Sequence, residues 1–205
     1  MFGDHFYHST MRKSVAVFGT LFNNIQVVRK KADGSTINQI RVPLAYGPKE
    51  KYLARIDSSA TSSMGIKLPR MAFDITGITL DTTQKMAKRN IISETHGSDI
   101  TKKKTIKHYT SYDIGMSLYI LAKNQDDGLQ IVEQILPYFQ PEYNVTITPV
   151  EGFNYKQDVS VILGGISIDD QYEGDFTERR VLTYQLDFTM KMKFFGPTAD
   201  QKIIR

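Results

Sequence analysis

Residues 182–194 read LTYQLDFTMKMKF, an unbroken alternation of apolar and polar side chains. A period of two predicts one long β-strand with an apolar face and a polar face. At about 3.3 Å per residue the strand would span about 45 Å, which is longer than a compact domain needs. Two interpretations stay open. The strand either projects from the body as part of a long β-hairpin or bends within one sheet.

Other strands are predicted by the same alternation. Residues 112–120 alternate in the same way, and 143–147 begin a shorter strand. Residues 25–31 and 37–45 predict a hairpin around Asp33-Gly34. Pro43 lacks a backbone donor, so we expect the second of these strands to lie at a sheet edge.

Two strands change phase at glycine residues. The apolar positions shift by one at Gly77 and again across Gly164-Gly165. A one-residue shift at glycine is typical of a β-bulge, which bends the strand that carries it. We therefore expect a bent, mainly antiparallel sheet of six or seven strands.

Two main helices are predicted by apolar residues at helical spacing. One covers residues 10–23, and the other begins near Asp126 with a stripe of Leu129, Val132, Leu136 and Phe139, which Ile131 and Ile135 widen. A shorter helix follows Pro48, which suits a first helical turn. The stretch 82–107 is polar without periodicity and is predicted to be a long loop. The sum is one α+β domain over residues 1–205, with the two main helices on one face of the sheet.

Composition and motifs exclude several kinds of function. The 205 residues include no cysteine, so disulfides, zinc–thiolate sites and thiol nucleophiles are absent. Phosphate loops, dinucleotide fingerprints and nucleophile elbows are missing, so we expect no enzyme activity, no cofactor and no metal. A net charge of +4 is mild for a nucleic-acid-binding domain. No apolar run approaches the roughly 20 residues that span a bilayer, so we expect no membrane association.

Charged residues gather in two places. A basic run lies at Lys102, Lys103, Lys104 and Lys107, and an acidic group includes Asp169, Asp170, Glu173 and Asp175. Opposite charges on separate segments suit recognition between subunits, because such contacts set orientation. Two solvated segments would explain the same charges.

Residues 126–141 read DDGLQIVEQILPYFQP and closely resemble the tail sheath stabilizer and completion proteins of T-even-type contractile-tailed phages. The stretches LFNNIQ (21–26) and IRVPLAY (40–46) agree with the same family in order. The similarity covers nearly the whole chain, with the middle loop least alike. The family-motif residues in the helix are Asp126, Gln130, Glu133, Gln134, Pro137, Tyr138, Phe139 and Pro141.

The resemblance implies a structural virion protein with a tail-terminator-like fold. It implies a homo-hexameric ring at the head-proximal end of the tail, assembled in the host cytoplasm and located in the tail–neck region. Its implied partners are the tail sheath protein, the tail tube protein and neck or head-completion proteins. Incidental contact with DNA in the channel is compatible with this role. Two alternatives stay open: another neck component, such as an adaptor or head-completion protein, and a nucleic-acid-binding module that uses the basic run.

Overall fold

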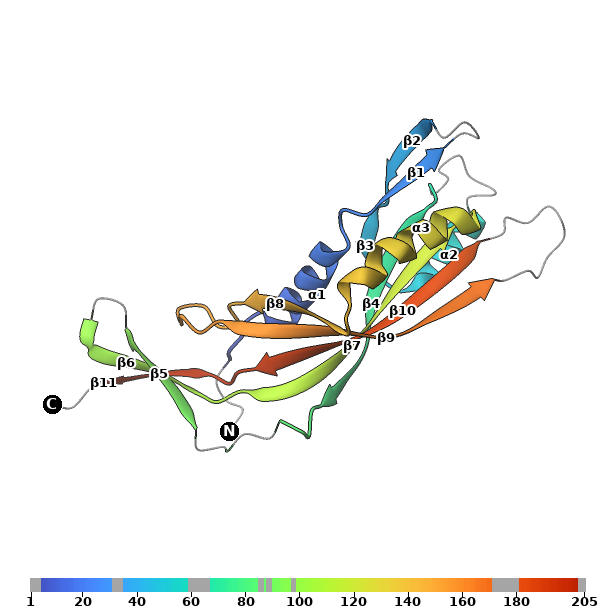
Figure 1. Cartoon of the computed structure of the whole chain (residues 1–205). Helices are drawn as coiled ribbons and strands as arrows, with labels where there is room; N and C mark the ends of the chain where they lie inside the picture. The colour runs from blue at the N-terminus through green and yellow to red at the C-terminus, as the bar shows by residue number, and fades with distance from the viewer. Residues whose placement is uncertain are drawn as a thin grey trace.

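The structure is a computed structural model that describes residues 5–30, 35–58, 67–84, 87, 90–96, 99–170 and 181–202. The helices in this part are α1 (Thr10–Leu21), α2 (Lys49–Ser58), α3 (Gln125–Ile135) and the 3-10 turn η1 (Leu136–Tyr138). The strands are β1 (Gln26–Lys30), β2 (Thr36–Arg41), β3 (Leu44–Tyr46), β4 (Arg70–Leu80), β5 (Ile91–His96), β6 (Asp99–Lys107), β7 (Thr110–Ala122), β8 (Glu142–Ile147), β9 (Gln157–Asp170), β10 (Leu182–Phe194) and β11 (Thr198–Lys202). The fold is therefore α+β, as predicted, and Figure 1 shows its long curved sheet.

The main sheet has six strands in the order β3-β4-β7-β10-β9-β8. Only the short β3–β4 pair is parallel, so the sheet is mainly antiparallel, as predicted. β10 is an interior strand, because β7 pairs with it from Leu182 to Phe194 and β9 pairs with it from Leu182 to Met190. The prediction that this strand projects from the body is therefore wrong. β7 is as long as β10, at 13 residues each, and supports it along its whole length.

Both predicted bulges are present. Thr76 is the extra residue between Ile75 and Gly77, and Gly164 is the extra residue between Leu163 and Gly165. One bulge lies on β4 and the other on β9, so strands on both sides of the sheet centre are bent.

Helices α1 and α3 pack on one face of the main sheet, as predicted for the two main helices. Phe18 of α1 and Ile131 of α3 lie in the same buried cluster as Phe188 of β10. The ring centroids of Phe18 and Phe188 are 5.3 Å apart. The shorter helix α2 packs on the opposite face, where Tyr52 joins Ala72 in a second cluster.

The buried side of α3 matches the predicted stripe in part, because Ile131, Val132 and Ile135 are buried as predicted. Leu129 and Leu136 are exposed, whereas Gly128, Ile131 and Ile135 face the core. Gly128 has no side chain, so the helix approaches the sheet closely there and turns this side inward. The α-helix ends at Ile135, before Pro137, because proline lacks the amide that would continue the helix.

The segment predicted as a loop at 82–107 forms two strands instead. β5 and β6 pair antiparallel, and β11 adds a third strand at the end of the molecule that carries the C-terminus (Figure 1). Its small core contains Ile106, Val150, Phe153 and Phe195. Side-chain periodicity misses this sheet, because the strands are held by backbone pairing over only a thin apolar layer.

The predicted hairpin near the N-terminus is present as β1 and β2, which pair antiparallel in a separate two-stranded ribbon. Its turn at Asp33-Gly34 lies outside the described residues. The second predicted strand divides at Val42-Pro43, because proline cannot donate to a ladder. β3 then forms the edge of the main sheet, where the carbonyl of Pro43 accepts a hydrogen bond from the amide of Met71. Among the described helices, none is both long enough and apolar enough to cross a bilayer.

Candidate assembly surfaces

The β1–β2 ribbon is attached to α3 by a buried ion pair. Arg29 of β1 lies 2.5 Å from the carboxylate of Asp127, whose side chain is 2% exposed. The hydrogen bond that Arg29 donates to Asp127 raises the pKa of Arg29, and burial opposes this rise only in part. Asp127 is in the first turn of α3, where the helix dipole also favours a negative charge.

Two glutamines extend the same attachment along α3. Gln130 Oε1 accepts a hydrogen bond of 3.1 Å from the amide of Val28, and Gln134 Nε2 donates one of 2.8 Å to the carbonyl of Gln26. Gln130 Nε2 also donates to Asp126 Oδ2 at 2.8 Å. Two family-motif residues, Gln130 and Gln134, therefore hold the ribbon against the helix, and a third, Asp126, orients Gln130.

The remaining motif residues lie at or near a shallow groove of about 470 Å³ between the ends of α1 and α3 and the start of β8. Phe139 is half-buried, and its ring contacts those of Phe22, Tyr143 and Phe188. Glu133, Pro137 and Tyr138 line the groove from the solvent side, and Pro141 is exposed just beyond it.

The outward side of α3 and η1 exposes three large apolar residues: Leu129, Leu136 and Tyr138. Tyr138 is 69% exposed, the largest exposure among the exposed large apolar side chains in the described part. We name Leu129, Leu136 and Tyr138 together with the groove the α3–η1 surface. Because the opposite side of α3 is tied to β1 and the core, this surface is rigid before any partner binds.

The basic run lies on β6, where strand geometry separates its side chains. Lys102 and Lys104 are on one face of the strand, and Lys103 and Lys107 are on the other. Lys104 also lies opposite Glu94 of β5 in the register. The run therefore does not form one basic patch.

The structure does not bring the acidic group to the basic run. β6 adjoins the end of the main sheet at Thr110, whereas Asp169 lies on β9 near the opposite end (Figure 1). The side chain of Asp170 and all of Glu173 and Asp175 lie outside the described part. A pairing between these charges within one chain is excluded for Asp169, and the pairing between subunits stays a prediction.

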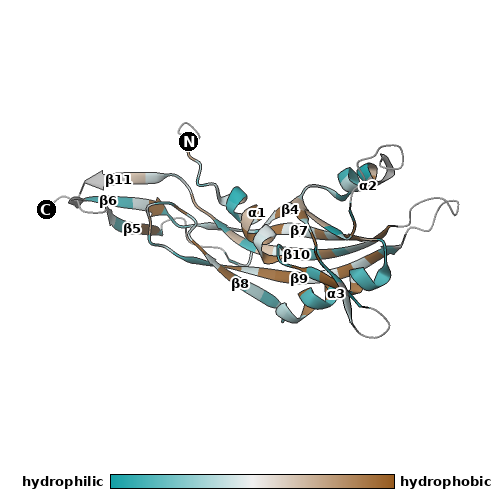
Figure 2. Cartoon of the chain, turned by 90° about the horizontal axis from the view of Figure 1, so that it is seen from above, coloured by the Kyte–Doolittle hydropathy of each residue, from teal (hydrophilic) through white to brown (hydrophobic). Residues whose placement is uncertain are grey.

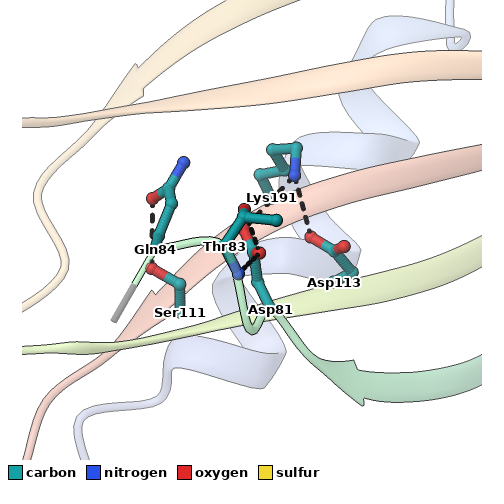
Figure 3. Close-up of polar contacts among 6 residues, drawn as sticks. All are labelled: Asp81, Thr83, Gln84, Ser111, Asp113 and Lys191. Carbon is teal, nitrogen blue, oxygen red and sulfur yellow. Dashed lines mark hydrogen bonds and ion pairs between the residues drawn. The ribbon is translucent and has the colours of Figure 1, made fainter. Parts of the chain in front are cut away.

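A polar cluster that sequence reasoning missed lies where β4 ends and the chain leaves for β5 (Figure 3). Lys191 Nζ is 3.3 Å from Asp81 Oδ2 and 3.4 Å from Asp113 Oδ1. Asp81 Oδ1 accepts hydrogen bonds from the amide and hydroxyl of Thr83, at 2.9 and 2.5 Å. The only sequence signal is that Asp113 and Lys191 occupy the polar positions of two alternating strands, which β7–β10 pairing places opposite each other.

The charges in this cluster shift two pKa values. Hydrogen bonds from Thr83, and then from Lys191, lower the pKa of Asp81. Burial disfavours the charged form of Lys191, but its hydrogen bonds and charge interactions with Asp81 and Asp113 outweigh burial and raise its pKa. Both groups are therefore charged near neutral pH, and the cluster holds the segment after β4 against β7 and β10 of the main sheet. Across the described residues, no three metal-ligating side chains gather at one point.

Comparisons with known proteins assign the family. The family model described as T4-like virus Myoviridae tail sheath stabiliser matches residues 5–205. The protein "Tail completion protein gp15" of Enterobacteria phage T4 is 30% identical over 213 residues, which cover 98% of this chain and 75% of that relative. These are structural tail proteins, so the prediction that the chain is not an enzyme is confirmed. The chain belongs to the tail sheath stabiliser family of T4-like Myoviridae and is a structural protein of a phage tail.

Proposed function

We propose that the chain folds as one domain and forms a hexameric ring at the head-proximal end of a contractile tail. In this position the ring ends the tube and the sheath and joins the tail to the neck. Its tail-terminator-like role is mechanical, because a bound ring occupies the site where another layer of subunits would add. The proposed partners are the sheath protein, the tube protein and the neck or head-completion proteins.

The observation that carries this proposal is the division of α3 into two sides. One side is tied to β1 and the core, and the other exposes Leu129, Leu136 and Tyr138. Large exposed apolar side chains on a rigid support favour protein binding, because little ordering entropy is lost on association. The tail role from the family supplies the class of partner.

The α3–η1 surface is the proposed contact for tail subunits. Tyrosine is enriched among residues that dominate binding energy, and Tyr138 stands beside a groove into which a partner side chain fits. Glu133 lies at the groove, where its charge sets the orientation of the contact more than it adds to the affinity.

The basic run supports the nucleic-acid alternative less than the sequence alone does. Lys102 and Lys104 face away from Lys103 and Lys107, so a single phosphate backbone cannot contact all four from one side. Incidental contact with DNA in a central channel is compatible with this arrangement.

The test is binding to the ends of tube–sheath tails assembled without a completion protein. Purified protein should cap these tails as a sixfold ring in negative-stain images. Replacing Tyr138 by alanine should weaken capping by about tenfold, because a central interface tyrosine contributes on this scale. The matched control is Tyr7→Ala, since Tyr7 is 66% exposed but far from α3 in the chain.

Three results would contradict the proposal. One is binding to portal or head-completion components but not to tail ends, which favours the other neck component. Another is a cap with a different symmetry. The third is equal loss of capping in both tyrosine variants, which would separate the α3–η1 surface from the function.

A further inference from the structure

Two strands of the main sheet have open edges over half their length. β3 pairs with Met71–Phe73 only, so no described strand covers the outer edge of β4 over residues 74–80. β8 pairs with β9 only from Gln157 to Ile162, so residues 163–170 have no described strand on that side. Figure 2 shows β4 along one margin of the sheet and β8 with β9 along the other.

Both open stretches are exposed on both faces. Every residue from Thr76 to Leu80 is exposed, and so is every residue from Gly164 to Asp169. Successive residues of a strand point to opposite faces, so neither face is covered there. We name residues 76–80 the β4 edge and residues 164–169 the β9 edge.

The two edges carry matching apolar side chains. Ile78 lies opposite Ile114, and Ile168 lies opposite Tyr184. Ile114 and Tyr184 both belong to the core under α1 and α3, so the two isoleucines are on that same face. Leu80 and Ile166 share this face in the same way, opposite Tyr112 and Leu186.

These edges lack the usual protection of a monomer. Exposed edges are normally blunted by lysine, proline or an inward charge, because unpaired backbone groups bind other strands. Residues 76–80 read TGITL, with no charge and no proline, and residues 164–169 read GGISID, in which the only charge is Asp169 at the far end of the edge. Each edge begins at a bulge, but the ladder is regular from Gly77 to Leu80 and from Gly165 to Asp170.

The directions of the two strands indicate that a second copy of this chain can pair with the open edges. Three antiparallel steps separate β4 from β9, so the two strands run in opposite senses. When a second copy is placed beside the first in the same orientation, its β9 edge is therefore antiparallel to the first copy's β4 edge. Contacts between two different patches on identical chains are heterologous, and they form a ring when the rotation between neighbouring copies closes.

We infer that the β4 edge of each copy pairs as an antiparallel strand with the β9 edge of the next copy. This pairing joins the sheets of neighbouring copies, and the isoleucines and leucine form one continuous apolar strip across the joint. Both edges lie in the C-terminal halves of their strands, and because the two strands are antiparallel the edges lie at opposite ends of the sheet. Successive copies are therefore staggered and the strands tilt, as in a closed barrel. The inference rests on the proposed ring and specifies its subunit contact.

Cysteine cross-linking tests the contact, because the chain has no cysteine of its own. The test variants combine Ile78→Cys with either Ile166→Cys or Ile168→Cys. Within one chain, positions 78 and 168 are separated by about 14 Å across three strand spacings and by about 20 Å along the strands. A disulfide needs Cα atoms within about 7 Å, so any disulfide joins two copies.

At least one double variant should give a ladder of disulfide-linked oligomers that ends at the closed ring, on non-reducing gels of the full-length ring. Each single variant alone should give none, and a mixture of two complementary single variants should give dimers only. Dimers from a single variant would overturn the inference, because they indicate an edge that pairs with itself. A ring that forms but is cross-linked by neither double variant would also overturn it while leaving the proposed function intact. Absence of any ring, free or on tails, would overturn both.

A second measurement uses charge. Leu80→Lys should raise the concentration needed for half-assembly by at least about tenfold, because pairing would bury the ammonium group. Its control is Phe6→Lys, since Leu80 and Phe6 are 46% and 48% exposed in one chain and Phe6 lies outside the strands and outside the α3–η1 surface. Equal assembly of the two variants would contradict the inference. Thermal unfolding of the monomers should be alike, which separates assembly from folding.

Discussion

Gly128 of α3 lies directly against the ring of Tyr184 on β10. A Cβ at position 128 would be 2.3 Å from Tyr184 Cε2 and 2.9 Å from Cζ, closer than atoms pack. Tyr184 is itself among the largest fully buried side chains. The absence of a side chain at 128 thus sets how closely α3 approaches the sheet.

The first prediction follows from this contact. Gly128→Ala should lower the free energy of unfolding by about 1–3 kcal/mol through overpacking, although alanine is the better helix former by about 1 kcal/mol. Urea denaturation measures the change. Gly196→Ala is the control, because a Cβ there meets no atom within 4 Å. A stabilised Gly128→Ala variant would show that helix propensity outweighs packing here.

The ion pair between Arg29 and Asp127 should respond asymmetrically to substitution. Arg29→Met leaves a carboxylate that is 2% exposed without its partner and should reduce stability by about 2 kcal/mol. Asp127→Asn leaves a guanidinium that is 39% exposed and can be hydrated, so we expect about 1 kcal/mol. The unfolding free energies of both variants and of the double variant measure this. Equal losses would mean that the pair behaves as a surface contact.

Gln130 should control the exchange of one backbone amide in β1. Gln130→Ala removes the acceptor of the Val28 amide, so hydrogen exchange there should accelerate by about fivefold, the equivalent of about 1 kcal/mol. Gln140→Ala is the control, because that side chain donates only to the carbonyl of Pro137 among the contacts described. The effect should be confined to β1. Acceleration throughout the sheet would indicate global destabilisation instead.

Acid should weaken the contact that holds the segment after β4 against β10. The pKa of Asp81 is lower in the folded chain than its ordinary value of 3.8, so its stabilisation is present above that value and is lost as pH falls through the folded pKa. Denaturation between pH 2.5 and 7 should show a flatter acid limb for Asp81→Asn than for the parent chain. Glu151→Gln, at a side chain that is 91% exposed, should retain the parent's slope. The raised pKa of Lys191 acts in the opposite sense, since its stabilisation is lost only at strongly alkaline pH.

The alternation of apolar and polar residues predicts which face of a strand is buried better than it predicts which strands lie beside it. The alternation from Leu182 to Phe194 and the phase changes at Gly77 and Gly164 each predict a feature that the structure contains. The interior position of β10 depends on the equal length of β7, which is information from a distant segment. The interpretation of 112–120 as a strand therefore succeeds, while the interpretation of β10 as projecting fails.

The same limit applies to the candidate surfaces. The resemblance points to residues 126–141, but it does not separate Gln130 and Gln134, which hold β1, from Tyr138, which faces solvent. The predicted α3 stripe is wrong at Leu129 and Leu136, because Gly128 counts as neutral in an apolar pattern and yet lies against Tyr184 of the sheet. The open edges at 76–80 and 164–169 depend on where β3 and β8 stop, and no residue inside either edge encodes that.

The β1–β2 ribbon also has a mechanical consequence. β1 follows α1 after a short turn, β2 leads into β3 across Val42 and Pro43, and the flank of β1 is tied to α3. Val42 itself is buried, and its amide donates to the carbonyl of Ile25. A pull along β1 therefore loads these anchors together in shear instead of breaking them one by one. Force applied to β1 reaches α1, α3 and the β3 edge of the main sheet together, so the ribbon transmits load as a stiff element.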